Sequence, residues 1–147
     1  MHITDIINKG RPTFSFEFFP PKSERASESL FETIKDLESL APSYVSITYG
    51  AGGTTRERTH DLVEKILEKT NLIPIPHLTC VQHTEEEISN ILKRYSDKGV
   101  SNILALRGDN PKGDAQFDRS KDSFCFAREL VEFILNYDNL ALDKKSK

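Results

Sequence analysis

Four short apolar runs recur along the chain, and each is followed by a stretch with helical periodicity. The runs, rich in β-branched and aromatic residues, are Thr13–Phe18, Tyr44–Tyr49, Pro74–Cys80 and Asn102–Leu106. Such runs are typical of strands, and their starts lie roughly thirty residues apart, the size of a strand–helix repeat. The pattern therefore predicts four βα units.

Apolar residues at helical spacing predict a helix after each strand. The second helix is expected from Arg56 to Lys69 and the fourth from about Ser123 to Asn136. Thr84 and Glu87 fit a capping box at the start of the third helix, and Gly99 stands where a C-cap glycine belongs. The expected buried stripes are Leu30, Ile34, Leu37 and Leu40; Leu62, Ile66 and Leu67; Ile88, Ile91, Leu92 and Tyr95; and Phe126, Leu130, Val131 and Ile134.

Strands that alternate with helices, without hairpin signals between them, predict a parallel sheet with right-handed crossovers. An open doubly wound sheet and part of a TIM-type (β/α)8 barrel both satisfy this order. A nucleotide-binding open sheet would carry a glycine fingerprint in its first βα turn, but residues 19–23 read FPPKS. A complete barrel usually takes about 250 residues and eight units. The 147 residues are therefore expected to form half a barrel.

The composition is that of an ordinary globular domain, with 37% hydrophobic and 29% charged residues. The net charge of −3 argues against a nucleic-acid-binding face, which would be basic. No apolar run approaches membrane-spanning length, and the N-terminus has no apolar signal region. Cys80 and Cys125 form no close-spaced pair and fit reduced thiols. We therefore expect a cytoplasmic protein that binds neither nucleic acid nor membranes.

Polar residues gather where the expected strands end. Parallel strands are normally continuous apolar runs, and the C-terminal ends of barrel strands meet at one mouth, where barrel active sites form. Singly, each residue has an ordinary structural explanation, but together they predict a functional site. They are Glu17 in the first strand, Thr48 and Tyr49 at the end of the second, His77 and Thr79 in the third, and Arg107, Gly108 and Asp109 after the fourth.

Glu17 lies among phenylalanines in the segment FSFEFFPP, residues 14–21. A carboxylate buried in apolar surroundings is costly, so the group tends to stay protonated with a raised pKa. A protonated carboxyl of this kind suits a general acid near neutral pH. The alternative is a strand-end glutamate whose head reaches water or a lysine.

Two further features are expected to be structural. His77, Cys80 and His83 have the side chains of metal ligands, but strand residues at this spacing alternate between faces and no fourth ligand is evident, so no metal site is expected. Pro74 and Pro76 cannot donate ladder hydrogen bonds, so the third strand is expected to begin near residue 75.

Four segments together resemble the methylenetetrahydrofolate reductase family. They are FSFEFFPPK around Glu17, VSITYGA around Thr48, PHLTC around His77 and ALRGD ending at Asp109, in the family's order and at its spacing. The resemblance covers about Phe14 to Tyr137. It implies an FAD-dependent (β/α)8 barrel that makes methyl-tetrahydrofolate for methionine synthesis. It also implies that NADH or NADPH gives a hydride to the flavin, which passes it to the folate substrate.

The resemblance implies catalytic roles for Glu17 and Asp109. Glu17 matches the general acid that protonates the folate nitrogen as the imidazolidine ring opens. Asp109 matches the carboxylate that lies beside the flavin and the folate, where it can stabilise a cationic intermediate. The residues matched to cofactor contacts are Thr48, Tyr49, Ala51, His77, Arg107, Gly108, Asp109, Phe126 and Ala127.

The family continues into four more strands, so the resemblance implies that the second half of the barrel lies outside this chain. Residues 139–142, NLAL, are expected to open a fifth strand, and residues 143–147 to form a basic tail after a partial barrel domain of residues 1–142. One expectation is a homo-oligomer or a partner chain that completes the barrel, since the last sheet edge would otherwise be exposed. The alternative is an inactive, truncated half-barrel with at most residual flavin or folate binding.

Overall fold

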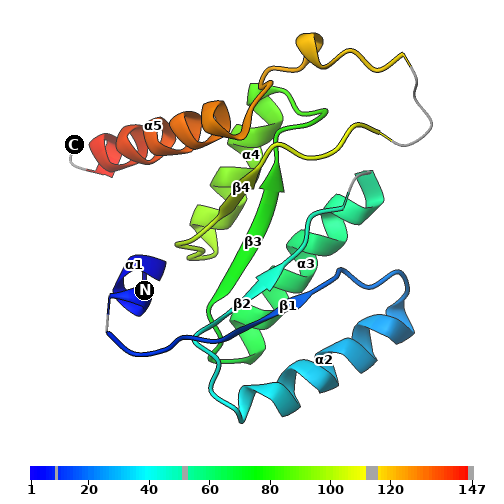
Figure 1. Ribbon diagram of the computed structural model, residues 1–147, viewed down its shortest axis with the longest axis vertical. Helices are drawn as coiled ribbons and strands as arrows, with labels where there is room; N and C mark the ends of the chain where they lie inside the picture. Colours follow the sequence, from blue (N-terminus) through cyan, green and yellow to red (C-terminus); the bar gives the residue numbers. More distant parts are fainter. Residues whose placement is uncertain (9, 51–52, 112–115, 146–147) are drawn as a thin grey trace. The chain divides into compact units, whose positions relative to one another are not determined.

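The computed structural model describes residues 1–8, 10–50, 53–111 and 116–145, and the side chains of these residues except 53–55, 121 and 138–145. Hydrogen bonds order four strands β1-β2-β3-β4 in one sheet, and the β1–β2 and β2–β3 pairs are parallel. The predicted alternation of strands and helices, and with it the (β/α) fold class, is confirmed. The elements, labelled in Figure 1, are α1 (Ile3–Ile7), β1 (Ser15–Phe18), α2 (Glu24–Glu38), β2 (Tyr44–Ile47), α3 (Gly53–Lys69), β3 (Pro74–Thr79), α4 (Glu85–Asp97), β4 (Leu104–Leu106), the 3-10 turn η1 (Arg119–Lys121) and α5 (Ala127–Lys145).

The chain forms two compact units. The first comprises Met1–His77 and Lys98–Leu104, and the second comprises Leu78–Asp97 and Ala105–Lys147. The boundaries between them pass through β3 and β4. The predicted site residues are thereby divided, with those of β1, β2 and the first part of β3 in one unit and those that follow β4 in the other.

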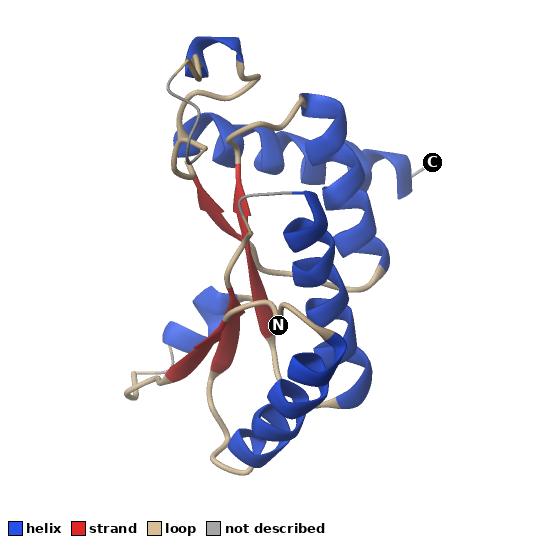
Figure 2. Cartoon of the chain, turned by 90° about the vertical axis from the view of Figure 1, so that its right-hand side faces the viewer, coloured by secondary structure: helices blue, strands red, loops and turns tan. Residues whose placement is uncertain are grey.

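Strand side chains of the first unit alternate between a helix-covered face and an open face. Successive strand residues point to opposite sides of a sheet, and α2 and α3 lie on one side of β1 and β2 (Figure 2). The apolar side chains buried on the covered face are Phe18, Val45, Ile47 and Pro76. Burial of these side chains beneath the helices favours one register, because a slip by one residue would expose them. The opposite face carries Glu17, Ser46 and His77, together with the buried Ile75.

Pro74 and Pro76 both lie within β3, which begins one residue earlier than expected. Alternate residues of a parallel strand bond to opposite neighbours. Cys80, just after the strand, is separated from both prolines by an even number of positions and so faces the same neighbouring strand. Its N–H donates to the Leu106 carbonyl at 3.0 Å. The prolines therefore face the β4 side of the sheet, at a level that precedes the first residue of β4. No ladder bond is demanded of them there, so proline is tolerated.

Helix ends follow the predicted signals. The Thr84 N–H donates to Glu87 Oε2 at 2.7 Å, and the Glu87 N–H donates to Thr84 Oγ1 at 3.2 Å, which is the reciprocal pair of a capping box. Gly99 follows α4 with φ of +79°, the left-handed conformation of a C-cap glycine. Ser23 caps α2, since its hydroxyl accepts the Ala26 N–H at 3.3 Å.

The predicted apolar stripes are buried or half-buried in most positions. Leu40, Phe126 and Val131 are exposed instead. Leu40 lies beyond the end of α2, and Phe126 precedes α5, which begins at Ala127 rather than near Ser123. None of the helices in the described part of the chain combines the length and the apolar character needed to cross a membrane.

The expected fifth strand at residues 139–142 is wrong, because these residues lie within α5 (Ala127–Lys145). The segment NLAL contains no β-branched residue, and neither glycine nor proline separates it from the preceding helical stretch. Leucine and alanine are strong helix formers, so the segment extends the existing helix. The short turn η1 (Arg119–Lys121) carries no periodic pattern and was not predicted.

Candidate active site

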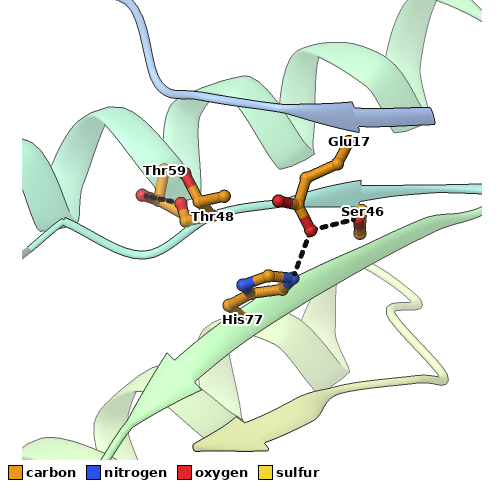
Figure 3. Close-up of polar contacts among 5 residues, drawn as sticks. All are labelled: Glu17, Ser46, Thr48, Thr59 and His77. Atoms are coloured by element: carbon orange, nitrogen blue, oxygen red, sulfur yellow. Dashed lines mark hydrogen bonds and ion pairs between the residues drawn. The ribbon is translucent and has the colours of Figure 1, made fainter. Parts of the chain in front are cut away.

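The open face of the first unit carries polar side chains at neighbouring register positions. The register pairs Glu17 of β1 with Ser46 of β2, and Ser46 with Ile75 of β3. His77 lies two residues beyond Ile75 and therefore faces the same side. The ladder thus brings a carboxyl, a hydroxyl and an imidazole together, and Figure 3 shows them converging. We name Glu17, Ser46 and His77 the strand cluster.

Glu17 is the centre of the strand cluster. The Ser46 hydroxyl donates to Glu17 Oε2 at 3.2 Å, and His77 Nε2 lies 3.4 Å from the same oxygen. Both contacts converge on one carboxylate oxygen (Figure 3). A carboxyl oriented in this way on an open face can exchange a proton with a molecule that lies over the face.

The aromatic pocket expected around Glu17 is absent from the described structure. The Glu17 side chain is 52% exposed, so its head is not enclosed. Phe16 and Phe18 point to the opposite face, because strand side chains alternate. The Phe16 ring packs edge-to-face against Phe14 with centroids 6.1 Å apart, and Phe19 is exposed. The alternative, a glutamate whose head reaches water, describes this chain.

His77 is almost enclosed, with 10% of its side chain exposed. Burial lowers its pKa because the imidazolium loses hydration, while the negative charge of Glu17 acts in the opposite direction and raises it. The net effect lowers the pKa, so the ring is neutral near pH 7. Among the described residues, Nε2 has no hydrogen-bond partner of good geometry, although Glu17 Oε2 lies 3.4 Å away. Such a nitrogen is suited to a polar atom of a ligand.

The chain is anchored where it leaves β2. The Thr48 N–H donates to the Phe18 carbonyl at 2.9 Å, which continues the β1–β2 ladder by one step. The Thr59 hydroxyl of α3 donates to the Thr48 carbonyl at 3.1 Å (Figure 3). The Tyr49 ring meets the His60 ring at a steep angle with centroids 5.9 Å apart. The helix that follows therefore anchors the backbone of Thr48 and contacts the ring of Tyr49.

Arg107, Gly108 and Asp109 lie in the irregular segment 107–110 that follows β4 in the second unit, which we name the turn after its left-handed Gly108. Gly108 has φ of +79°. A Cβ built on Gly108 would lie 2.5 Å from Val81 Cγ1 and 3.0 Å from Thr79 Cβ. Conformation and space both exclude a side chain there, so only glycine fits. The residues Arg107 and Asp109 are exposed, so the turn presents two opposite charges to solvent.

Phe126 and Ala127 lie at the start of α5. Glu129 Oε2 accepts the backbone N–H of Cys125 at 2.6 Å and that of Phe126 at 3.1 Å. This side-chain cap satisfies two N–H groups near the helix start. Phe126 is 59% exposed. The predicted flavin-side residues thus sit at a well-anchored helix start, with an aromatic ring open to contact.

Sequence reasoning missed two residues of these sites. Ser46 carried a signal, because it precedes Thr48 by two positions in a strand and so shares its face. Arg119 carried no such signal in the sequence, because η1 belongs to no strand or helix pattern. Its guanidinium donates to the carbonyl groups of Arg107 at 3.4 Å and Gly108 at 3.2 Å.

The predicted site residues therefore fall into separate groups. Glu17 and His77 are in contact, and Arg107, Gly108 and Asp109 are consecutive in the segment after β4. Ala51 lies outside the described residues, so its flavin contact stays a prediction. Within the described ranges, no group of three or more His, Cys, Asp or Glu side chains is arranged to hold a metal ion.

Comparison with known proteins gives one consistent result. The family model described as methylenetetrahydrofolate reductase matches residues 2–142. The 5,10-methylenetetrahydrofolate reductase of Escherichia coli (strain K12) is 38% identical over 126 residues, which are 85% of this chain and 43% of the bacterial protein. Its namesake in Salmonella typhimurium is 43% identical over 126 residues, with the same shares. Methylenetetrahydrofolate reductase (NADH) 1 of Arabidopsis thaliana is 38% identical over 132 residues, which are 90% of this chain and 22% of the plant protein. The chain thus spans less than half the length of these relatives.

Proposed function

Because the chain belongs to the methylenetetrahydrofolate reductase family, we propose that it supplies part of a flavin-dependent active site. The proposed reaction reduces 5,10-methylenetetrahydrofolate to 5-methyltetrahydrofolate, with FAD as cofactor and NADH or NADPH as hydride donor. The observation that carries this proposal is the strand cluster, which sets a carboxyl, a hydroxyl and an imidazole on the open face of the strands.

Two features of the chain fit a flavin. His77 Nε2 is buried without a hydrogen-bond partner in the described structure, and a polar edge of the cofactor would provide one. The turn at Gly108 leaves Arg107 exposed, where its guanidinium suits the anionic phosphates of FAD. Thr48 and Tyr49 are proposed as further cofactor contacts, and Phe126 and Ala127 as contacts on the flavin side. When bound, the flavin supplies hydride transfer from the nicotinamide to the folate substrate.

Glu17 is proposed as the general acid that protonates the folate nitrogen when its ring opens. A general acid must reach the substrate atom directly, and the half-exposed carboxyl on the open face meets this condition. A substrate lying over the face would exclude water, which favours the uncharged, proton-bearing form of a carboxyl. The hydrogen bond from Ser46 fixes the orientation of the acid.

Asp109 is proposed to stabilise positive charge that develops on the folate. It is exposed on a turn whose backbone is fixed by Gly108. A fixed carboxylate aimed at a developing cation lowers the barrier without reorganising during the reaction.

Glu17→Gln separates the two half-reactions. In the full chain supplied with FAD, the variant should lose folate reduction by about 10²- to 10⁴-fold, because the proton donor is gone. Reduction of the flavin by NADH should persist, since that step needs no proton from Glu17. Stopped-flow absorbance of the flavin measures both steps, and Glu32→Gln, an exposed glutamate of α2, is the matched control. Equal loss of both half-reactions would contradict the assignment of Glu17.

The same assay tests the activity of the chain itself. NADH oxidation with a folate or menadione acceptor is expected from the wild-type chain. Its absence at every protein concentration would contradict activity and favour the alternative of an inactive fragment that retains at most flavin or folate binding.

A further inference from the structure

Arg119 holds the turn that carries Asp109 from both sides. Its Nη1 donates to the Arg107 carbonyl at 3.4 Å, and its Nη2 donates to the Gly108 carbonyl at 3.2 Å and to Asn110 Oδ1 at 2.7 Å. Two of these acceptors precede Asp109 in the chain and the third follows it. One guanidinium thus bridges the whole turn across Asp109.

Only arginine suits this arrangement. Its planar guanidinium presents several N–H donors in a fixed fork, whereas lysine offers a single compact ammonium group. The fork of Arg119 is itself held, because its guanidinium carbon lies 5.7 Å from the centroid of the Phe117 ring. Asp118 Oδ1 accepts both the Ser120 N–H at 3.1 Å and the Ser120 hydroxyl at 2.7 Å, which fixes η1 around Arg119.

The start of the turn is also bound to the residues that follow β3. The Arg107 carbonyl also accepts the Val81 N–H at 3.2 Å and the Cys80 thiol at 3.2 Å. With Arg119, three donors therefore share the Arg107 carbonyl oxygen, which has two lone pairs. The hydrogen bonds of Arg119 link the turn to η1.

We infer that Arg119 is a positioning residue for Asp109, which rests on the role proposed above for Asp109. By holding the backbone before Asp109 and the side chain after it, the guanidinium fixes where the exposed Asp109 carboxylate points. No direct contact between Arg119 and a ligand is needed. The role requires the fork geometry of arginine and is not met by positive charge alone.

Amide hydrogen exchange on the full chain tests the inference independently of catalysis. Arg119→Gln and Arg119→Lys should each accelerate exchange of the Val81 amide about tenfold or more, because the turn it bonds to opens more often. Amides of α4, in the same unit, should keep their rates. Arg128→Gln is the matched control, since Arg128 lies 78% exposed on α5, where it pairs with Glu132.

FAD titration followed by flavin fluorescence provides the second readout. Both Arg119 variants should weaken FAD binding about tenfold or more, and Arg128→Gln should bind as the wild type does. Unchanged Val81 exchange in both Arg119 variants would overturn the inference. Wild-type amide exchange and FAD affinity in Arg119→Lys would also overturn it, because positive charge alone would then explain the effect. Faster amide exchange throughout α4 would overturn it as well, because the effect would then be general instability. If the wild-type chain binds no FAD, the proposed function fails, while the exchange rates still decide the role of Arg119.

Discussion

The strand cluster and the turn Arg107–Asn110 are held in place by different means. In the strand cluster, the β-ladder sets Glu17, Ser46 and His77 side by side, and the apolar residues on the opposite face secure the register. The turn depends on two individual residues, a glycine without room for a side chain and an arginine with three acceptors. A site held by backbone register tolerates changes in its own side chains, whereas a site held by single contacts does not.

Gly108→Ala should break the turn and give the largest effect. Left-handed strain together with the clash against Val81 should lower the free energy of unfolding by about 4 kcal/mol. Gly99→Ala is the matched control, because Gly99 has the same φ of +79° but no neighbouring atom within 4 Å of a Cβ. That control should lose only about 1–2 kcal/mol. Urea unfolding measures both, and equal losses would show that the turn is not sterically constrained.

Ile47→Ala should have the next largest effect, because it removes packing that secures the strands. Ile47 is fully buried, and truncation to alanine should cost about 3 kcal/mol. Its neighbour Ser46 faces the opposite side, so Ser46→Ala should cost less than about 1 kcal/mol, the value of one exposed hydrogen bond. Urea unfolding of the pair tests the alternation directly. Comparable losses would contradict the two-faced arrangement of the strands.

Glu17→Gln should change the titration of His77 with the smallest effect on stability. The pKa of folded His77 lies below its ordinary value of 6.5, so the unfolded chain binds its proton more readily. The contribution of His77 therefore lowers the free energy of unfolding as the pH falls from 6.5 to the folded pKa. Below the folded pKa this loss stays constant. Removal of the Glu17 charge, which raises the pKa of His77, should lower that pKa further. Histidine NMR titration measures this shift, with Glu32→Gln as control. An unchanged or higher pKa would show that Glu17 exerts no field on His77.

Elements with local signals could be predicted from the sequence. The strand–helix alternation follows from hydrophobic period, and the ends of α4 follow from Thr84, Glu87 and Gly99, whose side chains or conformations act within a few residues. The meeting of Glu17 and His77 was also foreseeable, since both lie on strands whose residues converge at one end of a parallel sheet.

Features that depend on distant contacts could not be predicted. The role of Arg119 depends on where η1 brings its guanidinium, which no periodic pattern encodes. The enclosure expected around Glu17 failed because neighbours in sequence point to opposite faces of a strand. Residues 139–142 were misassigned because a short apolar run is ambiguous between strand and helix, and the helix before it simply continues.

The most direct test of the central claim, that this chain builds part of a flavin site, is the visible absorption spectrum of the purified chain after FAD addition and gel filtration. The account predicts a flavin band that co-elutes with the protein and is bleached by NADH. A chain that elutes compact and without any flavin band would contradict it, and would show that the matched residues do not assemble into a cofactor site.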